Sequence, residues 1–507
     1  MTGGLIQLVA YGDQDLFLSS DPQITFFKIV YRRHTNFSTE IIKQPFVGNP
    51  EFGRRITCIL SRNGDLIRKL YLVAVLPMIP QFVDENGNID VITKFAWVRR
   101  VGFALIKNIE IELGGELIDR QYGDWLNIWY ELTVTRQKHI PKLIGDVKEL
   151  VEYTNGKPSY KLYIPLQFWF NRFAGLAIPL VALQYNHVKL NIEFNNFDSL
   201  YTLAPTHYIN IENDFVNFQQ YEYIEQHVDG FTSLAQFVHF DIMNKRLYLR
   251  RITDNRFKSP CEDTICFDKY IIKGLCSKFE AIPCIDAIEK NDQNRNLNLK
   301  NISLKESYIL AEYIFLDDEE RIRFTQARHE YLIEQLQYEG EQTIDGMHQK
   351  FKIGFSQPTK EIIFVSQLTE ALNTRLNQHF NYTDSLLTNC CGEYIGRNIL
   401  TKASIIFNGQ ERVSYRDISY YSDVQIYQNH THGPREGINV YSFSINPEKH
   451  QPSGAANLTQ IDNIRLRIET VPKINICRTA KLRTYCLSYN VLRIATGISG
   501  LVFTSDS

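Results

Sequence analysis

The feature that constrains this chain most is an internal repeat, in which four short segments of the first half recur in the same order in the second. The matched pairs are Lys69–Val73 with Glu361–Val365, Ile111–Gly115 with Ile405–Gly409, Val188–Glu193 with Ile464–Glu469, and Glu312–Phe315 with Ser488–Val491. Each match alone is short enough to arise by chance. Four matches in the same order predict a duplicated domain.

The repeated unit is predicted to be a β domain. Phe and Tyr number 31 and 28, and these residues suit the half-buried surfaces of sheets. Short apolar segments are punctuated by turn pairs such as Asn63-Gly64 and Asn408-Gly409. The predicted strands are Ile24–Tyr31, Arg55–Leu60, Leu66–Val75, Ile106–Leu113, Val188–Phe194, Tyr308–Leu316, Glu361–Val365, Ala403–Phe407, Ile464–Ile468 and Tyr485–Ile494.

Helical periodicity is sparse. It predicts one helix over Asp317–Leu336, rich in Glu and Arg, and another over Ser366–Phe380, where Leu recurs at four-residue steps. Many short strands with few helices indicate β-sandwiches or barrels.

The spacing of the repeats also predicts an insertion. The offset between matched segments falls from 276 to 176 at the last pair, so the first half carries 100 extra residues there. The insertion should lie between about Leu200 and Ser303, and its end, Glu289–Asn301, has the composition of a solvated loop. A loop this long must emerge from one end of the sandwich, because a buried loop would leave backbone groups unpaired.

Composition excludes several classes of protein. A chain of 507 residues is long enough for two or three domains. A net charge of -2 lacks the basic excess of a nucleic-acid coat, so no direct nucleic-acid binding is expected. The longest apolar run, Leu70–Pro80, is about half of the ~20 residues that a spanning helix needs. We therefore expect a protein that is not membrane-spanning and folds in the cytosol.

Two sets of residues are of the types that could bind zinc or a catalytic metal. Nine cysteines, unevenly spread, indicate reduced thiols rather than a disulfide framework. Four of them could offer thiolates to zinc, but no C-x-x-C pair is present. These four are Cys261, Cys266, Cys276 and Cys284. The acidic run Asp317–Glu320 is interpreted as the first turn of a helix, with a divalent-cation site as the alternative.

The second set is His430, His432 and Glu436. Alternate residues of a strand share a face, so the two histidines could bind one metal, as in cupin-like barrels. Gly433-Pro434 breaks such a strand, however, and Asn457 stands where the second cupin motif needs a His. The alternative is a polar loop with exposed imidazoles. We expect no catalytic residues, no metal and no cofactor.

Longer segments resemble the double jelly-roll major capsid proteins of nucleocytoplasmic large DNA viruses. The resemblance spans nearly the whole chain. It rests on Gly3–Gly12, Asp21–Lys28, Tyr31–Phe37, Gly114–Asp119 with Tyr122–Trp125, Ile178–Tyr185, Tyr313–Asp317 with Glu320 and Arg321, His329–Gln335, Gly437–Tyr441, Asn446–Gly454 and Ile461–Asn463. Departures at Ser19–Asp21 and Ala455–Asn457, and the long insertion, leave a minor-capsid paralogue open.

The resemblance implies an all-β fold of two tandem eight-stranded jelly-roll sandwiches. The expected division is an N-terminal arm (1–24), a first jelly roll (25–316) with its insertion at about 200–303, a linker (317–328) and a second jelly roll (329–507). The arm would tie to the inner shell or to neighbouring capsomers, and the insertion would form a tower on the outer face.

The implied function is structural, without enzymatic activity. Homotrimers would form pseudo-hexagonal capsomers that tile the icosahedral shell of a large DNA virus. The implied partners are neighbouring capsomers, minor capsid or cement proteins and penton proteins, in a shell that can overlie an internal membrane. The protein would be made and assembled in the host cytoplasm and end in the virion capsid. Two rival classes are a bicupin-like metalloenzyme using His430, His432 and Glu436, and a carbohydrate-binding sandwich.

Overall fold

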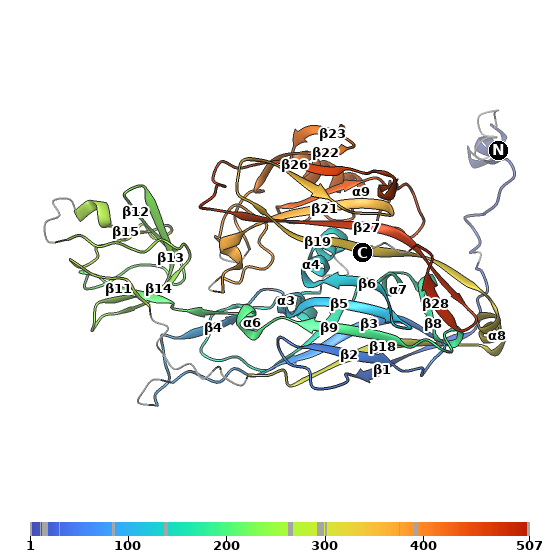
Figure 1. The fold of residues 1–507 in the computed structure, drawn as a ribbon, viewed down its shortest axis with the longest axis horizontal. Helices are drawn as coiled ribbons and strands as arrows, with labels where there is room; N and C mark the ends of the chain where they lie inside the picture. The colour runs from blue at the N-terminus through green and yellow to red at the C-terminus, as the bar shows by residue number, and fades with distance from the viewer. Residues whose placement is uncertain are drawn as a thin grey trace.

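A computed structural model describes residues 3–503 except 11, 13–18, 30, 84–86, 136–139, 262–266, 292–298, 300–301, 375 and 390–392. Two β-sandwiches lie one above the other in Figure 1, and a smaller sheet domain projects from one end of the pair. Every strand pairing in the sheets is antiparallel.

The first sandwich is built from two sheets, which run β1-β18-β3-β7 and β2-β9-β5-β6. The two-residue strand β8 (Ile178–Pro179) adds to the edge of β3. The strand bounds are β1 Phe37–Pro45, β2 Arg55–Leu60, β3 Leu66–Leu76, β5 Ile106–Leu113, β6 Glu116–Tyr122, β7 Tyr160–Pro165, β9 Val188–Phe194 and β18 Glu306–Leu316.

The second sandwich repeats this strand order, with sheets β19-β27-β21-β24 and β20-β26-β22-β23. Its strands are β19 His329–Ile344, β20 His348–Ile353, β21 Pro358–Leu368, β22 Leu400–Phe407, β23 Gln410–Asp417, β24 Ile438–Ser442, β26 Ile464–Thr470 and β27 Ala480–Ala495, with β25 Ala456–Asn457 and β28 Ile498–Leu501 added at β21 and β27. Matching sheet orders in consecutive halves are those of a double jelly roll.

All four repeated segments lie on strands with the same place in the two sandwiches. Lys69–Val73 and Glu361–Val365 belong to β3 and β21, the third strand of each first sheet. The other pairs fall on β5 and β22, β9 and β26, and β18 and β27. Sequence similarity between the halves therefore reflects a real structural duplication.

The insertion has a fold of its own. Strand β10 (Tyr201–Ala204) pairs with β4 (Lys94–Trp97), and the chain then forms a sheet in the order β16-β15-β12-β13-β14-β11-β17. The strand bounds are β11 His207–Asn210, β12 Tyr223–Val228, β13 Phe231–Asp241, β14 Arg246–Arg251, β15 Ile272–Gly274, β16 Glu280–Ala281 and β17 Lys290–Asn291. A separate apolar cluster that includes Ile209, Phe237 and Leu249 supports it. Sequence reasoning placed the insertion but missed its sheet.

Helices are short. The α-helices are α1 Gly3–Val9, α3 Val101–Leu105, α4 Gly123–Thr133, α5 Pro141–Ile144, α6 Lys148–Val151, α7 Trp169–Arg172, α8 Asp318–Gln326 and α9 Gln425–Asn429. The π-helical turn η7 (Tyr420–Val424) runs into α9. Single 3₁₀ turns are η2 Ala174–Leu176, η3 Leu180–Ala182, η4 Phe197–Ser199, η5 Phe267–Tyr270, η6 Thr369–Leu372 and η8 Leu458–Gln460.

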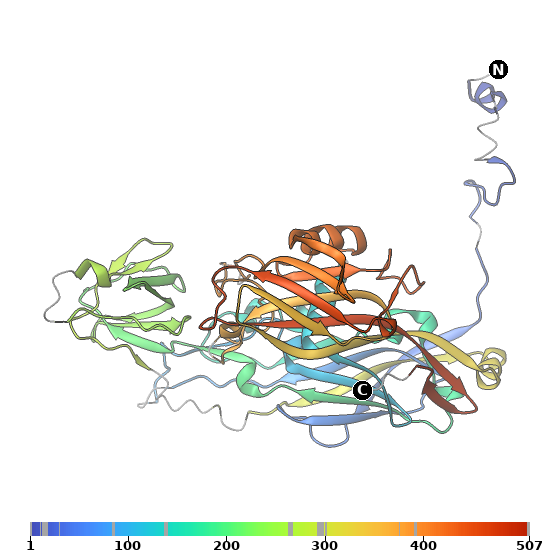
Figure 2. The same cartoon turned by 45° about the horizontal axis from the view of Figure 1, so that its top comes forward.

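Nine of the ten predicted strands coincide with strands or lie within them. Ile24–Tyr31 does not, because the described residues of this segment form no strand and instead run along an arm that projects away from both sandwiches (Figure 2). Phe26 and Phe27 are 91% and 97% exposed there. An apolar run with no neighbouring strand cannot complete the backbone hydrogen bonds of a sheet.

Both predicted helices were too long. Helix α8 ends at Gln326, and His329–Leu336 instead begins β19, which pairs along its length with β27. Ser366–Leu368 completes β21, and only the 3₁₀ turn Thr369–Leu372 follows. In both places pairing with a distant strand overrides the local helical preference. The acidic run begins α8 as predicted, with the Asp317 side chain accepting a hydrogen bond from the Asp318 backbone N–H.

Candidate functional site

The three residues weighed as alternative metal ligands, His430, His432 and Glu436, do not meet. His430 lies directly after α9, so His430 and His432 do not alternate along a strand. The His432 Nδ1 lies 2.9 Å from the backbone carbonyl oxygen of Glu131, and Glu436 lines a cavity of about 260 Å³ between the two halves. Among the residues that the structure describes, no three His, Cys, Asp or Glu side chains are grouped to hold a metal. The arrangement of these described residues gives the bicupin-like alternative no support.

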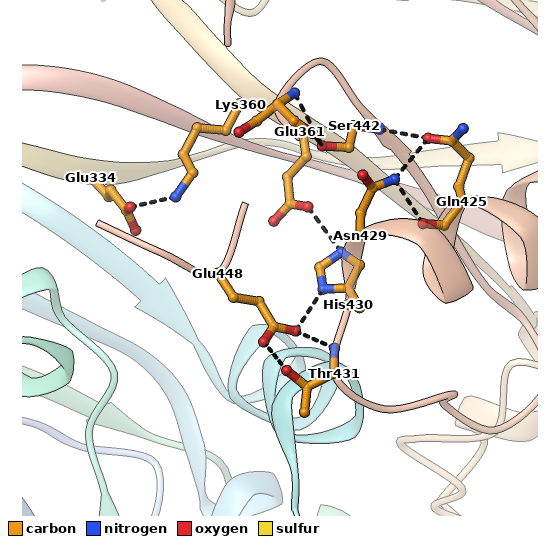
Figure 3. A network of polar contacts seen from close by, with 10 residues as sticks. Glu334, Lys360, Glu361, Gln425, Asn429, His430, Thr431, Ser442 and Glu448 are labelled. Carbon is orange, nitrogen blue, oxygen red and sulfur yellow. Dashed lines mark hydrogen bonds and ion pairs between the residues drawn. The ribbon is translucent and has the colours of Figure 1, made fainter. Parts of the chain in front are cut away.

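His430 instead completes a buried ion network (Figure 3). Its Nε2 lies 3.0 Å from Glu361 on β21, and its Nδ1 lies 3.1 Å from Glu448. Burial alone would lower the pKa of His430, but the two carboxylates outweigh it and raise the pKa to about 9. The imidazolium is thus the stable form at neutral pH, and both ring nitrogens donate hydrogen bonds.

The same network crosses between the two halves. Lys360, fully buried on β21, pairs with Glu334 on β19, and Arg172 on α7 of the first half lies 2.6 Å from the second oxygen of Glu334. With His430 protonated, three cations balance three carboxylates, which a buried cluster requires. Sequence reasoning missed this network, although charged residues beside the apolar run of β21 were a visible signal.

Helix α4 is the main connection between the sandwiches. Its apolar side chains pack on the outward face of the sheet β19-β27-β21-β24 and form one cluster with strands of the second half. The cluster contains Trp125, Ile128, Trp129, Leu132, Leu336, Ile363, Val365, Tyr382, Ile426, Ile438, Val440, Tyr485 and Leu487. Figure 1 shows α4 between the two sandwiches.

Asp124 fixes the start of α4 on that face. Its carboxylate lies 3.0 Å from the Arg483 guanidinium and accepts hydrogen bonds from the hydroxyls of Tyr485, at 2.8 Å, and Tyr382. Burial and the nearby carboxylate raise the pKa of both tyrosines well above their usual range, so both stay protonated donors. The connection between the halves is therefore specific in charge as well as in packing.

The cavity beside α4 is lined by ion pairs that connect residues of the chain to one another. Arg100 lies 2.5 Å from Glu131 and 3.5 Å from Asp146, and Arg435 lies 3.1 Å from Glu393. The arginines that line it are thus paired with acids of the protein itself.

The described cysteines, six of which are free thiols, agree with the prediction of reduced thiols. Cys261 and Cys276 are exposed and Cys284 is half-buried in the insertion, while Cys266 lies outside the described residues. The three described thiols belong to no metal-binding group. None of the helices that the structure describes is long and apolar enough to cross a membrane.

Large apolar side chains are exposed on the surface of the chain, outside the cavity described above. The N-terminal segment that precedes β1 carries exposed apolar side chains, including Leu8, Phe26, Phe27 and Ile29. The two consecutive sandwiches with the same sheet order define the double jelly-roll class of protein.

Family models agree over both halves. "Major capsid protein N-terminus" matches residues 25–232, and "Large eukaryotic DNA virus major capsid protein" matches residues 320–500. The chain is 41% identical to "Probable capsid protein 4" of Acanthamoeba polyphaga mimivirus and 32% identical to the major capsid protein of Phaeocystis pouchetii virus, over the full length of each pair. The Faustovirus major capsid protein superposes with a TM-score of 0.66 at 12% identity, covering 97% of this chain and 96% of its own.

The chain belongs to the major capsid proteins of large eukaryotic DNA viruses. The predicted family and the double jelly-roll fold are thereby confirmed. It is a structural component of the virion capsid, and its relatives are capsid proteins rather than enzymes.

Proposed function

We propose that this chain forms homotrimeric capsomers of pseudo-hexagonal outline that tile an icosahedral shell. One observation carries the proposal: the two sandwiches have the same sheet order and are joined by a specific packed interface. Two similar wedges per chain give six around a threefold axis, which suits a hexagonal lattice. Head-to-tail contacts between chains related by a threefold rotation close into a ring.

The same proposal gives each remaining part a role. The two sandwiches form the wall, the domain of about residues 200–303 stands as a tower on the outer face, and the arm (1–24) contacts the inner shell or neighbouring capsomers. Phe26 and Phe27, which are exposed just after this arm, support an N-terminal segment that becomes covered on assembly. Neighbouring capsomers, cement and penton proteins complete the partners, and synthesis and assembly take place in the host cytoplasm.

Light scattering after size exclusion tests the trimer. The expected molar mass is three times the 59.1 kDa of the chain. A stable monomer or dimer at micromolar concentration would contradict the capsomer and favour a minor-capsid role. Deleting residues 2–20 should leave the trimer intact but impair shell assembly, and loss of the trimer on this deletion would contradict the role of the arm.

A further inference from the structure

The outward face of the sheet that contains β21 is buried within the chain, whereas, among the residues that the structure describes, the outward face of the matching sheet, which contains β3, is not packed against a helix such as α4. Along β21, Ile363 and Val365 point outward from the second sandwich and are buried under α4, while Ile362 and Phe364 point into its core. The repeated segment of the first half, Lys69–Val73, places Tyr71 and Val73 on the matching outward face of β3. Its other side chains, Leu70 and Leu72, fill the first core.

The outward face of the first sandwich has the chemistry of an interface. Val73 lies at its centre between Tyr308 and Tyr163, which are its partners in the sheet register. The Nζ of Lys43 lies 4.1 Å from the ring centroid of Tyr308, and the Nζ of Lys161 lies 5.4 Å and 5.5 Å from the rings of Tyr163 and Tyr308. We name this surface the tyrosine–lysine face; it consists of Lys43, Lys69, Tyr71, Val73, Lys161, Tyr163 and Tyr308.

The tyrosine–lysine face is only partly covered within the chain. Val73 and Tyr308 are buried at its centre, Tyr71 and Tyr163 are half-buried, and Lys43 and Lys161 are exposed. The carboxylates of Glu306 and Glu312 pair with Lys43 and Lys69, which leaves the face with one lysine more than it has carboxylates. The face thus combines aromatic area with a positive charge.

The second half carries a helical segment that matches α4. Turn η7 and helix α9 follow β23 as α4 follows β6, the matching strand of the first half. Helix α4 presents Asp124, Trp125 and Ile128, and η7–α9 presents Asp423, Val424 and Tyr427 at the same spacing. Trp125 and Ile128 are buried against the second sandwich, whereas Val424 is 41% and Tyr427 90% exposed.

We propose that η7–α9 of one copy docks on the tyrosine–lysine face of a second copy, in the way that α4 docks on the second sandwich within one chain. This inference rests on the proposed trimer and names its contact surfaces. Asp423, which is exposed, would face Lys161, as Asp124 faces Arg483 at 3.0 Å inside the chain. Such a contact between copies is head-to-tail, and a threefold rotation would close it into the proposed trimer.

Charge reversal tests the pairing. Asp423→Lys and Lys161→Glu should each raise the concentration at which half the trimer dissociates by about tenfold or more, because each places like charges in contact. The double variant should restore the trimer. Both residues are exposed, so near-ultraviolet circular dichroism should show every variant folded. Met243→Glu, on the 92% exposed tip of the insertion hairpin, is the matched control and should not change the midpoint. Unchanged midpoints in the single variants, or no recovery in the double variant, would overturn the pairing.

Cross-linking separates this inference from the proposed trimer. Differently tagged chains carrying Tyr427→Cys and Tyr163→Cys should, when mixed and oxidised with diamide, give a covalent heterodimer on a denaturing gel. Neither variant alone should give it. A trimeric wild type without this cross-link overturns the docking surfaces and leaves the capsomer standing. A monomeric wild type overturns both.

Discussion

The two sandwiches share a strand order but differ in what covers them. The outward face of the sheet β19-β27-β21-β24 is buried under α4 and fixed by Asp124, whereas the matching face of the first half is partly open. Their last connections also differ, because β26 leads to β27 through a short loop while β9 leads to β18 through a whole domain. Duplication therefore preserved the scaffold, and the surfaces of the two copies took different uses.

The largest effect on stability is expected from weakening the contact between α4 and the covered face of the second sandwich. Trp125→Ala should lower the free energy of unfolding by about 3–5 kcal/mol, because it leaves a large cavity among buried side chains. Tyr163→Ala, at a half-buried position of the open face, should lower the free energy of unfolding of the dissociated chain by only about 1 kcal/mol. Urea unfolding measures both, and equal costs would contradict the difference between the faces.

The buried ion network should make stability depend on alkaline pH. The folded pKa of His430, about 9, lies above its ordinary value of 6.5. The stabilisation is therefore complete below about pH 6.5 and is lost as pH rises through 9, at a cost of about 3 kcal/mol. Urea midpoints from pH 6 to 10 measure this slope.

His430→Gln is the matched variant for that slope. It should be less stable at neutral pH, because Glu361 stays buried without its cation, and its stability should fall less between pH 6.5 and 9. The same slope in the variant and the wild type would assign the titration to another group.

Replacing the inserted domain tests whether its contacts stabilise the two sandwiches. Exchanging residues 207–290 for a Gly-Ser linker removes the burial of Ile252 against the second core and the hydrogen bond of Tyr223 to Thr388. We expect the free energy of unfolding to fall by about 2 kcal/mol. Both sandwiches should still fold, and the trimer should be retained. Collapse of the sandwiches, seen by circular dichroism, would show that the insertion is an integral part of the first half.

Metal should have the smallest effect. His430 is occupied by two carboxylates and His432 faces a backbone carbonyl, so neither is free to act with Glu436. EDTA or added Zn²⁺ should leave the melting temperature unchanged. Stoichiometric metal that is lost on His432→Ala would contradict this.

The sequence predicted the duplication and the family from its repeated and matching segments. It predicted most central strands because each of them is a short apolar run with turn residues at its ends. It failed where distant contacts decide the structure. His329–Leu336 has helical character in isolation and becomes a strand because β27 lies beside it. Likewise, Glu334 and Glu361 appear as ordinary surface charges in the sequence, and only the fold brings Arg172 and His430 to them.

Helix α4 has a consequence for how the chain is made. Its apolar side chains leave the ribosome more than two hundred residues before β21, and Tyr485 follows later still. At about 5–20 residues per second, synthesis of the covering strands takes on the order of tens of seconds. During that time Trp125 and Trp129 lack the strands that cover them, even after β18 completes the first jelly roll, so the nascent chain should be a substrate for hydrophobic-binding chaperones until its second half arrives.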